Sequence, residues 1–324
     1  MENEKDILVR VEDLKQWFPV KRWFFEKKLY VTAVDGVTFD VYRGETLGVA
    51  GESGCGKSTL IRAMLRIIDP TAGTVCYEDK NITKMSRTAL RPLRTNMQIV
   101  FQDPYSSLDG KWKVGNIIGE PLVINKIAKT KAERDARVKE LMLLVGLDPS
   151  YVDRYPHEFS GGQRQRIVIA RALATNPALL MCDEAVSALD VSVRAQVLNL
   201  LEELQDKLKL TYIFVSHDLS VIEHICDRVM IMYLGKIMEI GTSEEIFGNP
   251  QHPYTRALLS AIPSVEPRDE SKIRIRLEGD IPSPVNPPEG CRFVTRCPQA
   301  TEKCREVPPT VDLGGGHLVS CHYV

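Results

Sequence analysis

The chain has 324 residues, of which 44% are hydrophobic and 26% charged, and its formal net charge is −1 at pH 7. A charge so close to zero gives no field that attracts nucleic acid or anionic lipid, so we expect no nucleic-acid partner. No apolar run reaches the roughly 18 residues of a membrane span, and the acidic start, Met1–Asp6, is unlike a signal peptide. We therefore expect a globular protein that stays in the cytoplasm.

Two strands are predicted near the N-terminus. Residues 7–18 begin with alternating apolar positions, and strand character returns at residues 30–41, where Asp35-Gly36 indicates a turn. The basic and aromatic segment 21–28 between them is typical of a hairpin loop.

A phosphate-binding loop gives the strongest signal. Residues 51–59 match G-x-x-x-x-G-K-[ST] between a short apolar strand at 46–50 and a helix at 60–65. Glycines let consecutive backbone N–H groups curl around a phosphate, and the helix N-terminus adds partial positive charge. Lys57 can neutralise the β- and γ-phosphates, and the Ser58 hydroxyl can bind Mg²⁺. The residues predicted to bind nucleotide in this phosphate loop are Gly51, Ser53, Gly54, Cys55, Gly56, Lys57, Ser58 and Thr59.

The base of a bound nucleotide needs a partner outside this loop. A purine ring stacks well on a flat apolar side chain, and Phe18 and Tyr30 are the candidates before the loop. We expect one of them to contact adenine, with Phe18 slightly favoured. The alternative is that each is only a packed aromatic residue.

A polar side chain follows the next predicted strand. Residues 97–101 are mostly apolar and lead to Gln102, whose carboxamide is suited to coordinate a metal ion or its water at the carboxyl edge of a sheet. Residues 105–158 are helical in character, and segment 131–146 has a broad apolar face. These patterns predict an inserted helical subdomain at about 104–165.

A second candidate anion site lies at Ser160-Gly161-Gly162-Gln163, called here the serine–glycine segment. It directly precedes a predicted helix at 164–175, so its N–H groups and the Ser160 hydroxyl can face an anion. One triphosphate does not need two such loops from one subunit, whereas two triphosphates shared across a dimer do. We therefore expect a dimer.

An acid pair ends the apolar strand predicted at 179–184. Asp183 and Glu184 emerge from apolar surroundings, where carboxylates are costly unless they meet a cation or take part in chemistry. Asp183 suits Mg²⁺, and Glu184 suits a general base that polarises the attacking water. The strand predicted at 212–215 leads to His217, which we expect to contact a γ-phosphate.

The order of these motifs resembles that of ABC-type ATPases over residues ~7–245. The resemblance implies an α/β P-loop NTPase fold with a RecA-like core, an N-terminal antiparallel β subdomain and an inserted helical subdomain. Phe159 replaces the usual Leu of the signature, and Ala185 replaces the Pro common in this branch, but neither change removes a catalytic group. The shared motifs are the phosphate loop, Gln102, the serine–glycine segment, Asp183-Glu184, Ser187-Ala188-Leu189-Asp190 and His217.

The same resemblance implies roles for these residues. ATP would bind with Mg²⁺, which would be served by Ser58, Gln102 and Asp183. Glu184 would be the catalytic base, with His217 at the γ-phosphate. Asp190 would belong to the dimer-contact loop, and the serine–glycine segment would close over ATP bound to the opposite subunit of a head-to-tail pair.

The C-terminal part resembles the extension of dipeptide/oligopeptide permease ATPases. After a hairpin predicted at 229–240 and a Pro-rich stretch at 281–288 come Gly290-Cys291-Arg292-Phe293 and Arg296-Cys297-Pro298, both typical of that branch, as is the segment 102–108. We expect an ABC nucleotide-binding domain at 1–245 and an extension at 246–324.

This resemblance implies an ATP-hydrolysing subunit that powers import of dipeptides or oligopeptides. Its partners would be a second, homologous ATPase subunit, a separate transmembrane permease and, indirectly, an extracytoplasmic peptide-binding protein. The chain would sit peripherally on the cytoplasmic side of the cell membrane. Alternatives are a related importer of nickel or another small solute, a soluble ABC-type ATPase of DNA repair or translation, and a metal-sensing regulatory module.

Four of the eight cysteines fall near the C-terminus, with the spacing C-x5-C-x6-C-x16-C. In a reducing compartment such a group favours metal over disulfides. Zinc sites usually show paired C-x2–4-C knuckles, which are missing here, so a [4Fe–4S] cluster is favoured, with Zn²⁺ as one alternative and no metal or disulfides as another. The predicted ligands are Cys291, Cys297, Cys304 and Cys321.

Overall fold

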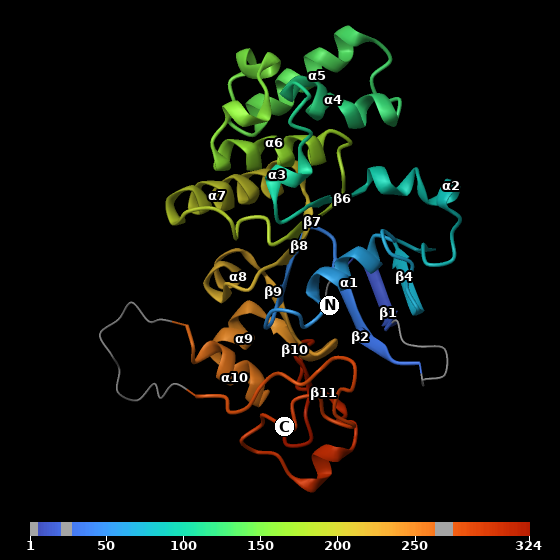
Figure 1. Cartoon of the computed structure of the whole chain (residues 1–324), viewed down its shortest axis with the longest axis vertical. Helices are drawn as coiled ribbons and strands as arrows, with labels where there is room; N and C mark the ends of the chain where they lie inside the picture. Colours follow the sequence, from blue (N-terminus) through green and yellow to red (C-terminus); the bar gives the residue numbers. More distant parts are fainter. Residues whose placement is uncertain (1–5, 21–27, 263–274) are drawn as a thin grey trace. The chain divides into compact units, whose positions relative to one another are not determined.

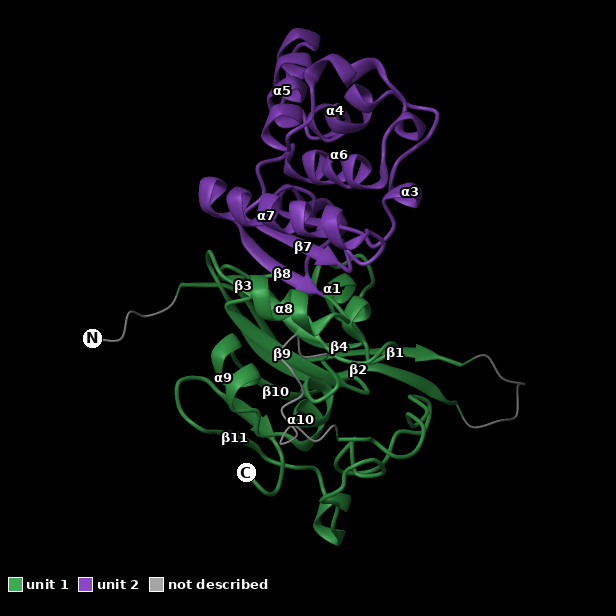
Figure 2. Cartoon of the chain, turned by 90° about the vertical axis from the view of Figure 1, so that its left-hand side faces the viewer, with its two compact units in different colours: residues 1–84, 216–324 green, residues 85–215 purple. Residues whose placement is uncertain are grey.

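The computed structural model describes residues 6–20, 28–262 and 275–324 (Figure 1). Contacts within the chain divide it into two units (Figure 2). The first unit contains Met1–Lys84 and Ser216–Val324, and the second contains Met85–Val215. The first is therefore built from both ends of the chain and the second from its middle.

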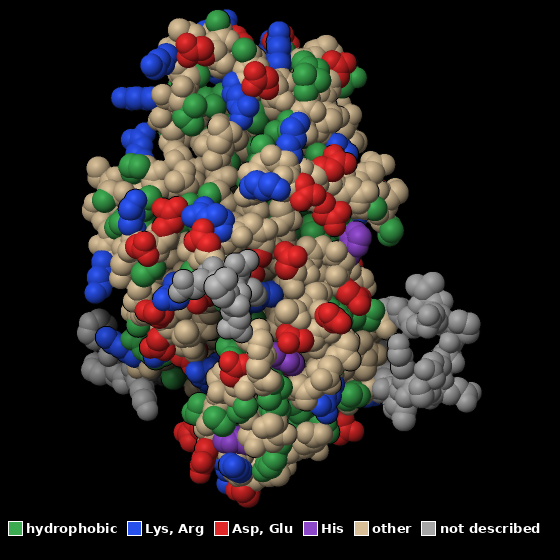
Figure 3. Space-filling model, turned by 180° about the vertical axis from the view of Figure 1, so that it is seen from behind, with side chains coloured by type: hydrophobic (Ala, Val, Ile, Leu, Met, Phe, Trp, Pro, Cys, Tyr) green, Lys and Arg blue, Asp and Glu red, His purple; other side chains and the backbone are tan. Residues whose placement is uncertain are grey.

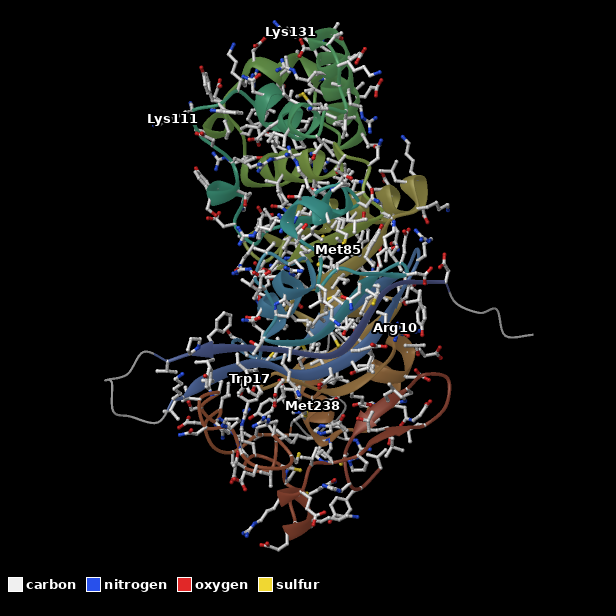
Figure 4. The ribbon with its side chains drawn as sticks, turned by 90° about the vertical axis from the view of Figure 1, so that its right-hand side faces the viewer. Arg10, Trp17, Met85, Lys111, Lys131 and Met238 are labelled. Carbon is white, nitrogen blue, oxygen red and sulfur yellow. The ribbon has the colours of Figure 1, made fainter. Side chains whose placement is uncertain are left out.

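An antiparallel sheet in the first unit has the strand order β2-β1-β4-β5. Its strands are β1 (Ile7–Pro19), β2 (Tyr30–Tyr42), β4 (Ala72–Tyr77) and β5 (Lys80–Asn81). β1 and β2 pair along their lengths, from Ile7 opposite Tyr42 to Pro19 opposite Tyr30. Figure 4 labels Arg10 and Trp17 at separate points along this long pair. The predicted N-terminal antiparallel β subdomain is thus present.

The turn predicted at Asp35-Gly36 is wrong, because β2 continues through it. Gly36 has φ 75°, and its pairing with β1 shifts register near Leu14, as in a β-bulge. A Cβ on Gly36 would lie 2.8 Å from Asp13 Oδ1, so this glycine permits the close approach of two paired strands. Most of the predicted loop at 21–28, namely residues 21–27, lies outside the described residues.

The first unit also holds part of a second sheet, with neighbouring strands in the order β11-β12-β10-β9-β3. β3 (Thr46–Ala50) is buried throughout and runs parallel to β9 (Arg228–Tyr233). β9 and β10 (Lys236–Thr242) form the predicted hairpin, whose Leu234-Gly235 turn has positive φ at both residues. The other strands are β11 (Thr310–Asp312) and β12 (Leu318–Ser320). The helices are α1 (Lys57–Met64), α8 (Leu219–Ile225), α9 (Ser243–Gly248), α10 (Pro253–Leu259) and the 3₁₀ turn η4 (Glu302–Arg305).

The second unit contains three parallel strands in the order β8-β7-β6. They are β6 (Met97–Val100), β7 (Leu179–Asp183) and β8 (Thr211–Val215), and β7 and β8 are buried throughout, as apolar runs in a parallel sheet should be. The longer helices of this unit are α4 (Val114–Ile124), α5 (Lys131–Leu144), α6 (Gly161–Leu173) and α7 (Val191–Leu208). The short elements are α2 (Arg87–Leu90), η1 (Leu93–Thr95), α3 (Pro104–Ser107), η2 (Pro149–Asp153) and η3 (Pro156–Glu158).

The C-terminal tail is fastened to the first unit. The N–H and Oγ1 of Thr32 both donate to the carbonyl of Pro284 at 3.0 Å, which ties the Pro-rich stretch to β2. Val319 of β12 pairs with Glu239 of β10, so the end of the chain extends the sheet that contains β3 (Figure 1). The predicted boundary at residue 246 remains a prediction.

Candidate functional site

The phosphate loop joins β3 to α1 in the first unit. Gly51, Gly54 and Gly56 have φ values of 146°, 78° and 110°, which side-chain-bearing residues rarely adopt. A Cβ on Gly56 would overlap the carbonyl oxygen of Ala33, and one on Gly51 would overlap that of Met232. The loop backbone therefore presses against β2 and β9, and helix α1 begins directly after it at Lys57.

The side chain of Lys57, the first residue of α1, folds back into the phosphate loop. Its Nζ donates to the carbonyl oxygens of Gly51 at 2.7 Å and Glu52 at 3.0 Å, and the residue is buried. Beside it, the Cys55 side chain is buried, and burial raises the pKa of its thiol. A lysine held in this way places its ammonium at the helix N-terminus, where phosphate binds in loops of this type.

The residue before His217 is hydrogen-bonded to β3. The N–H of Ser216 donates to the carbonyl of Val49, three residues before Glu52, at 3.3 Å, and the N–H of Asp218 donates to Ser216 Oγ at 3.0 Å. The backbone of His217 is thus held between two fixed neighbours beside the strand that enters the phosphate loop. Its predicted contact with a γ-phosphate remains a prediction.

The two candidate adenine partners lie toward the ends of β1 and β2. Phe18 is 38% exposed and Tyr30 is 37% exposed, so either ring can meet a ligand. Tyr30 also packs on Trp17, with ring centroids 6.3 Å apart and planes tilted by 50°. Trp17 was not among the predicted residues, and it is held by a bond of 3.2 Å from Nε1 to Asp35 Oδ1. Which aromatic contacts adenine stays a prediction.

In the second unit, Gln102 and Glu184 are hydrogen-bonded. Gln102 Nε2 donates to Glu184 Oε2 at 2.8 Å. Adjacent parallel strands β6 and β7 produce this contact, because both residues follow the carboxyl ends of their strands. Asp183, one residue earlier on β7, is 2% exposed.

The backbone of Glu184 adopts an uncommon conformation. Its φ is 50°, and its N–H donates to the carbonyl of Val215 at 3.0 Å, while its own carbonyl accepts from Ser187 Oγ at 2.9 Å. A non-glycine residue at positive φ costs about 1–3 kcal/mol and persists where surrounding bonds over-determine it, commonly at functional sites. The hydrogen bond to Val215 of β8 therefore fixes the backbone of Glu184, and with it the direction of the carboxylate.

The serine–glycine segment forms the start of α6, with Ser160 as the N-cap and Gly161 as the first helical residue. Ser160 Oγ accepts from the N–H of Gln163 at 3.3 Å, and Gln163 Oε1 accepts from the N–H of Ser160 at 3.0 Å, which forms a capping box. A Cβ on Gly162 would collide with Val193 Cγ1 of α7, so glycine is required for the packing of the two helices. Asp190 caps α7 by accepting from the Val193 N–H at 2.9 Å, and this bond lowers the pKa of its carboxyl.

The predicted residues therefore fall on both units. The phosphate loop and His217 belong to the first, whereas Gln102, the serine–glycine segment, Asp183, Glu184 and Asp190 belong to the second. Of these, the structure joins Gln102 to Glu184 directly.

Two residues bond to the phosphate loop without having been predicted to do so. Arg296 binds the Glu52 carboxylate through both terminal nitrogens, at 2.7 and 3.1 Å, and the Tyr254 hydroxyl accepts from the Glu52 N–H at 3.0 Å. Both lie more than 200 positions from Glu52 along the chain, so no local pattern indicates the contact. The only available signal was the Arg-Cys-Pro motif, which drew attention to Cys297 rather than to Arg296.

The four C-terminal cysteines line one small pocket together with Phe293 and His252. Burial raises the pKa of the Cys291 thiol to about 11 and also raises that of the Cys297 thiol. The cysteines are free thiols, and the described residues contain no group of three or more His, Cys, Asp or Glu arranged to hold a metal. The predicted metal site therefore remains a prediction.

Within the described ranges, no helix combines the length and apolarity needed to cross a membrane. Acidic and basic side chains are interspersed on the face seen in Figure 3, in keeping with the net charge of −1.

Two family descriptions match this chain. Residues 34–187 match "ABC transporter", and residues 238–304 match "Oligopeptide/dipeptide transporter, C-terminal region". The second match ends at the third cysteine of the C-terminal group, Cys304.

Proteins similar along their whole length carry transport names. The chain is 52% identical to the dipeptide transport ATP-binding protein DppF of Haemophilus influenzae, over 99% of this chain and 98% of that protein. It is 51% identical to the oligopeptide transport ATP-binding protein AppF of Bacillus subtilis, over 98% of each. These relatives include the C-terminal extension as well as the part that carries the phosphate loop.

Solved structures resemble the chain over about three quarters of its length. CbiO1 from Clostridium perfringens, part of the ABC transporter complex CbiONQ, matches with TM-score 0.65 and 28% identity over 76% of this chain and 92% of that one. The dimeric structure of MJ0796, a bacterial ABC transporter cassette, matches with TM-score 0.64 and 26% identity over 72% of this chain and 98% of that one. The expected ABC ATPase fold is thereby confirmed.

Proposed function

The chain belongs to the ABC transporter family of ATP-binding proteins, and from that premise we propose that it hydrolyses ATP to power import of dipeptides or oligopeptides through a separate membrane permease. One observation supports this proposal above all. About half of the residues are identical, over nearly the whole chain, to those of proteins named for dipeptide and oligopeptide transport. The match extends through the C-terminal region, which bears the oligopeptide/dipeptide transporter description.

The residues of the phosphate loop would bind the triphosphate of ATP. Loop N–H groups and the Lys57 ammonium stabilise the negative phosphates, and the loop glycines allow the close approach. Phe18 or Tyr30 would stack on adenine, since both rings have exposed surface. Mg²⁺ fits the donor set of Ser58, Gln102 and Asp183, which offers the hydroxyl, amide and carboxylate oxygens that this hard cation prefers. When bound, the ion would neutralise charge on the β- and γ-phosphates.

Glu184 would act as the general base. Its carboxylate takes a proton from the attacking water as the water oxygen bonds to the γ-phosphorus and the bond to the β-phosphate oxygen breaks, giving ADP and phosphate. The hydrogen bond from Gln102 and the constrained backbone at φ 50° fix the direction of this carboxylate. His217 would donate a hydrogen bond to the γ-phosphate.

The serine–glycine segment would act on ATP held by a second ATPase subunit in a head-to-tail pair, with Asp190 in the contact loop. Two candidate anion sites on one chain, at the phosphate loop before α1 and at the α6 N-terminus, support this arrangement. A mixing experiment tests it. Lys57→Ala and Ser160→Arg chains should each be inactive alone, whereas their mixture should regain up to about a quarter of wild-type activity, because only mixed pairs contain one intact site. Full activity of either variant alone would contradict the shared site.

The proposed location is peripheral, on the cytoplasmic side of the cell membrane beside the permease, with an extracytoplasmic peptide-binding protein as an indirect partner. A radiolabelled dipeptide and nickel should be compared as cargo in cells whose own copy is deleted. Restored peptide uptake by the wild-type gene, but not by Glu184→Gln, would support the proposal. Restored nickel uptake alone would favour the related importer, and no transport phenotype would favour a soluble ATPase.

For the C-terminal cysteines we propose a [4Fe–4S] cluster, with Zn²⁺ as the alternative, held by Cys291, Cys297, Cys304 and Cys321. Support comes from the four thiol donors that line one pocket, because thiolates are the ligands that both iron–sulfur clusters and zinc accept. Absorbance near 400 nm after anaerobic purification, together with iron analysis, tests the proposal, and Cys304→Ser should abolish the signal. One equivalent of zinc without colour would establish the alternative.

A further inference from the structure

Glu52, the second residue of the phosphate loop, is held at three points in the first unit. Its N–H donates to the Tyr254 hydroxyl at 3.0 Å. Its carbonyl accepts from Lys57 Nζ at 3.0 Å and from the N–H of Cys55 at 3.3 Å. Its carboxylate binds Arg296 through two parallel bonds of 2.7 and 3.1 Å. The conformation of the loop at Glu52 is therefore set by residues from α10 and from the C-terminal tail as well as by the loop.

The ion pair between Arg296 and Glu52 is sheltered. The Arg296 side chain is 8% exposed and that of Glu52 is 23% exposed. Arg296 Nη1 also donates to the Tyr233 hydroxyl at 3.3 Å, and the hydrogen bond to Glu52 raises the pKa of the guanidinium, which stays charged. A two-pronged pair of this kind fixes geometry as well as charge, and removing one partner leaves the other charge poorly compensated.

Arg296 is itself held in place by the cysteine-lined part of the tail. Its N–H donates to the carbonyl of Phe293 at 3.0 Å, and the fully buried Phe293 ring packs against Tyr233 and Tyr254 at centroid distances of 5.4 and 5.2 Å. Phe293 also lines the pocket that contains Cys297, the residue after Arg296. The packing of the tail thus determines where the guanidinium points.

We propose that Arg296 and Tyr254 are positioning residues for nucleotide binding, through which the C-terminal tail sets the affinity of the phosphate loop for ATP. They act through Glu52, whose carbonyl bonds to Lys57, and they touch no substrate atom. Without them the loop gains freedom that must be lost again when the triphosphate binds, so binding weakens. This inference rests on the proposed binding of ATP at the same loop.

The test compares full-length variants by their dissociation constants for ATP and their steady-state ATPase kinetics. Arg296→Met and Glu52→Gln should each raise the Kd and KM for ATP about tenfold, while kcat at saturating ATP stays within about twofold, since uniform binding is lost. The double variant should bind no more weakly than the weaker single variant, because both changes remove one interaction. Arg296→Lys should recover part of the affinity, and Tyr254→Phe should weaken binding less.

Arg305→Met is the matched control. Arg305 lies in the same tail, but its side chain is 76% exposed, and its ion pair among the described residues is with the nearby Glu302 at 3.1 Å. Its replacement should therefore leave the Kd for ATP unchanged. If Arg296→Met fails to fold, the milder Glu52→Gln and Tyr254→Phe changes decide the question. Wild-type binding with unchanged affinity in Arg296→Met and Glu52→Gln would overturn this inference alone. A wild-type chain that binds no ATP would overturn the proposed function together with it.

Discussion

Gln102 Nε2 lies 2.8 Å from Glu184 Oε2, so the amide that follows β6 holds the carboxylate that follows β7. The contact arises from the register of two parallel strands, in which Val100 lies opposite Cys182. It links a proposed Mg²⁺ ligand to the proposed base. Replacing one of these residues should therefore change the orientation of the other side chain.

Gln102→Ala should lower kcat more than it weakens ATP binding. Without the amide, the Glu184 carboxylate loses a hydrogen bond that fixes its direction, and general-base catalysis depends on such alignment. We expect kcat to fall about 10- to 100-fold, with the Kd for ATP changed less than about threefold. The rate of phosphate release at saturating ATP measures kcat, and equilibrium ATP binding measures the Kd. An unchanged kcat would mean that the contact is irrelevant to turnover.

Gly56→Ala should abolish nucleotide binding and destabilise the fold. The new Cβ would clash with the carbonyl oxygen of Ala33. In addition, residue 56 has φ 110°, a backbone conformation that costs a non-glycine residue about 1–3 kcal/mol. Gly110→Ala is the control, since no heavy atom of the described residues lies within 4 Å of the Cβ position and its φ is not positive. Urea unfolding and ATP binding should separate the two variants clearly, and equal stability would contradict the account of this loop.

Asp35 should make stability depend on pH. Burial opposes ionisation of its carboxyl, but Lys236 Nζ at 3.5 Å and Arg292 Nη2 at 2.6 Å outweigh burial and lower its pKa. A carboxyl whose pKa is lower in the folded state stabilises the fold above its unfolded pKa, about 4, and that contribution is lost as the pH falls through the folded value.

Asp35→Asn should therefore cost about 1–3 kcal/mol of unfolding free energy at pH 7. The difference from wild type should shrink as the pH falls from 5 toward 3. Urea unfolding at several pH values measures it. A difference that stays constant over this range would show that the charge of Asp35 does not contribute.

The sequence predicted those elements whose apolar runs are unbroken. The strands predicted at 179–184 and 212–215 are observed at Leu179–Asp183 and Thr211–Val215, because a continuous apolar run is typical of a strand buried in a parallel sheet. The turn predicted at Asp35-Gly36 failed because Gly36 serves a bulge, and local propensity does not distinguish the two.

The parts of the site that sequence could not predict depend on contacts between distant positions. Gln102 and Glu184 were each singled out by their place after a strand, but their hydrogen bond depends on which strands are neighbours. The pair between Arg296 and Glu52 joins the tail to the loop across 244 positions, and no period or motif relates them. The cysteine spacing likewise suggested a shared site, but only the packing of the tail shows that all four cysteines line one pocket.

The most direct test of ATP hydrolysis by this chain is a comparison of wild type and Glu184→Gln for ATP binding and phosphate release. Glutamine keeps the size of the side chain but cannot accept a proton from water. We predict that the variant binds ATP with wild-type affinity and that its turnover falls at least about 100-fold. Phosphate release by Glu184→Gln at the wild-type rate would contradict the assignment of the base.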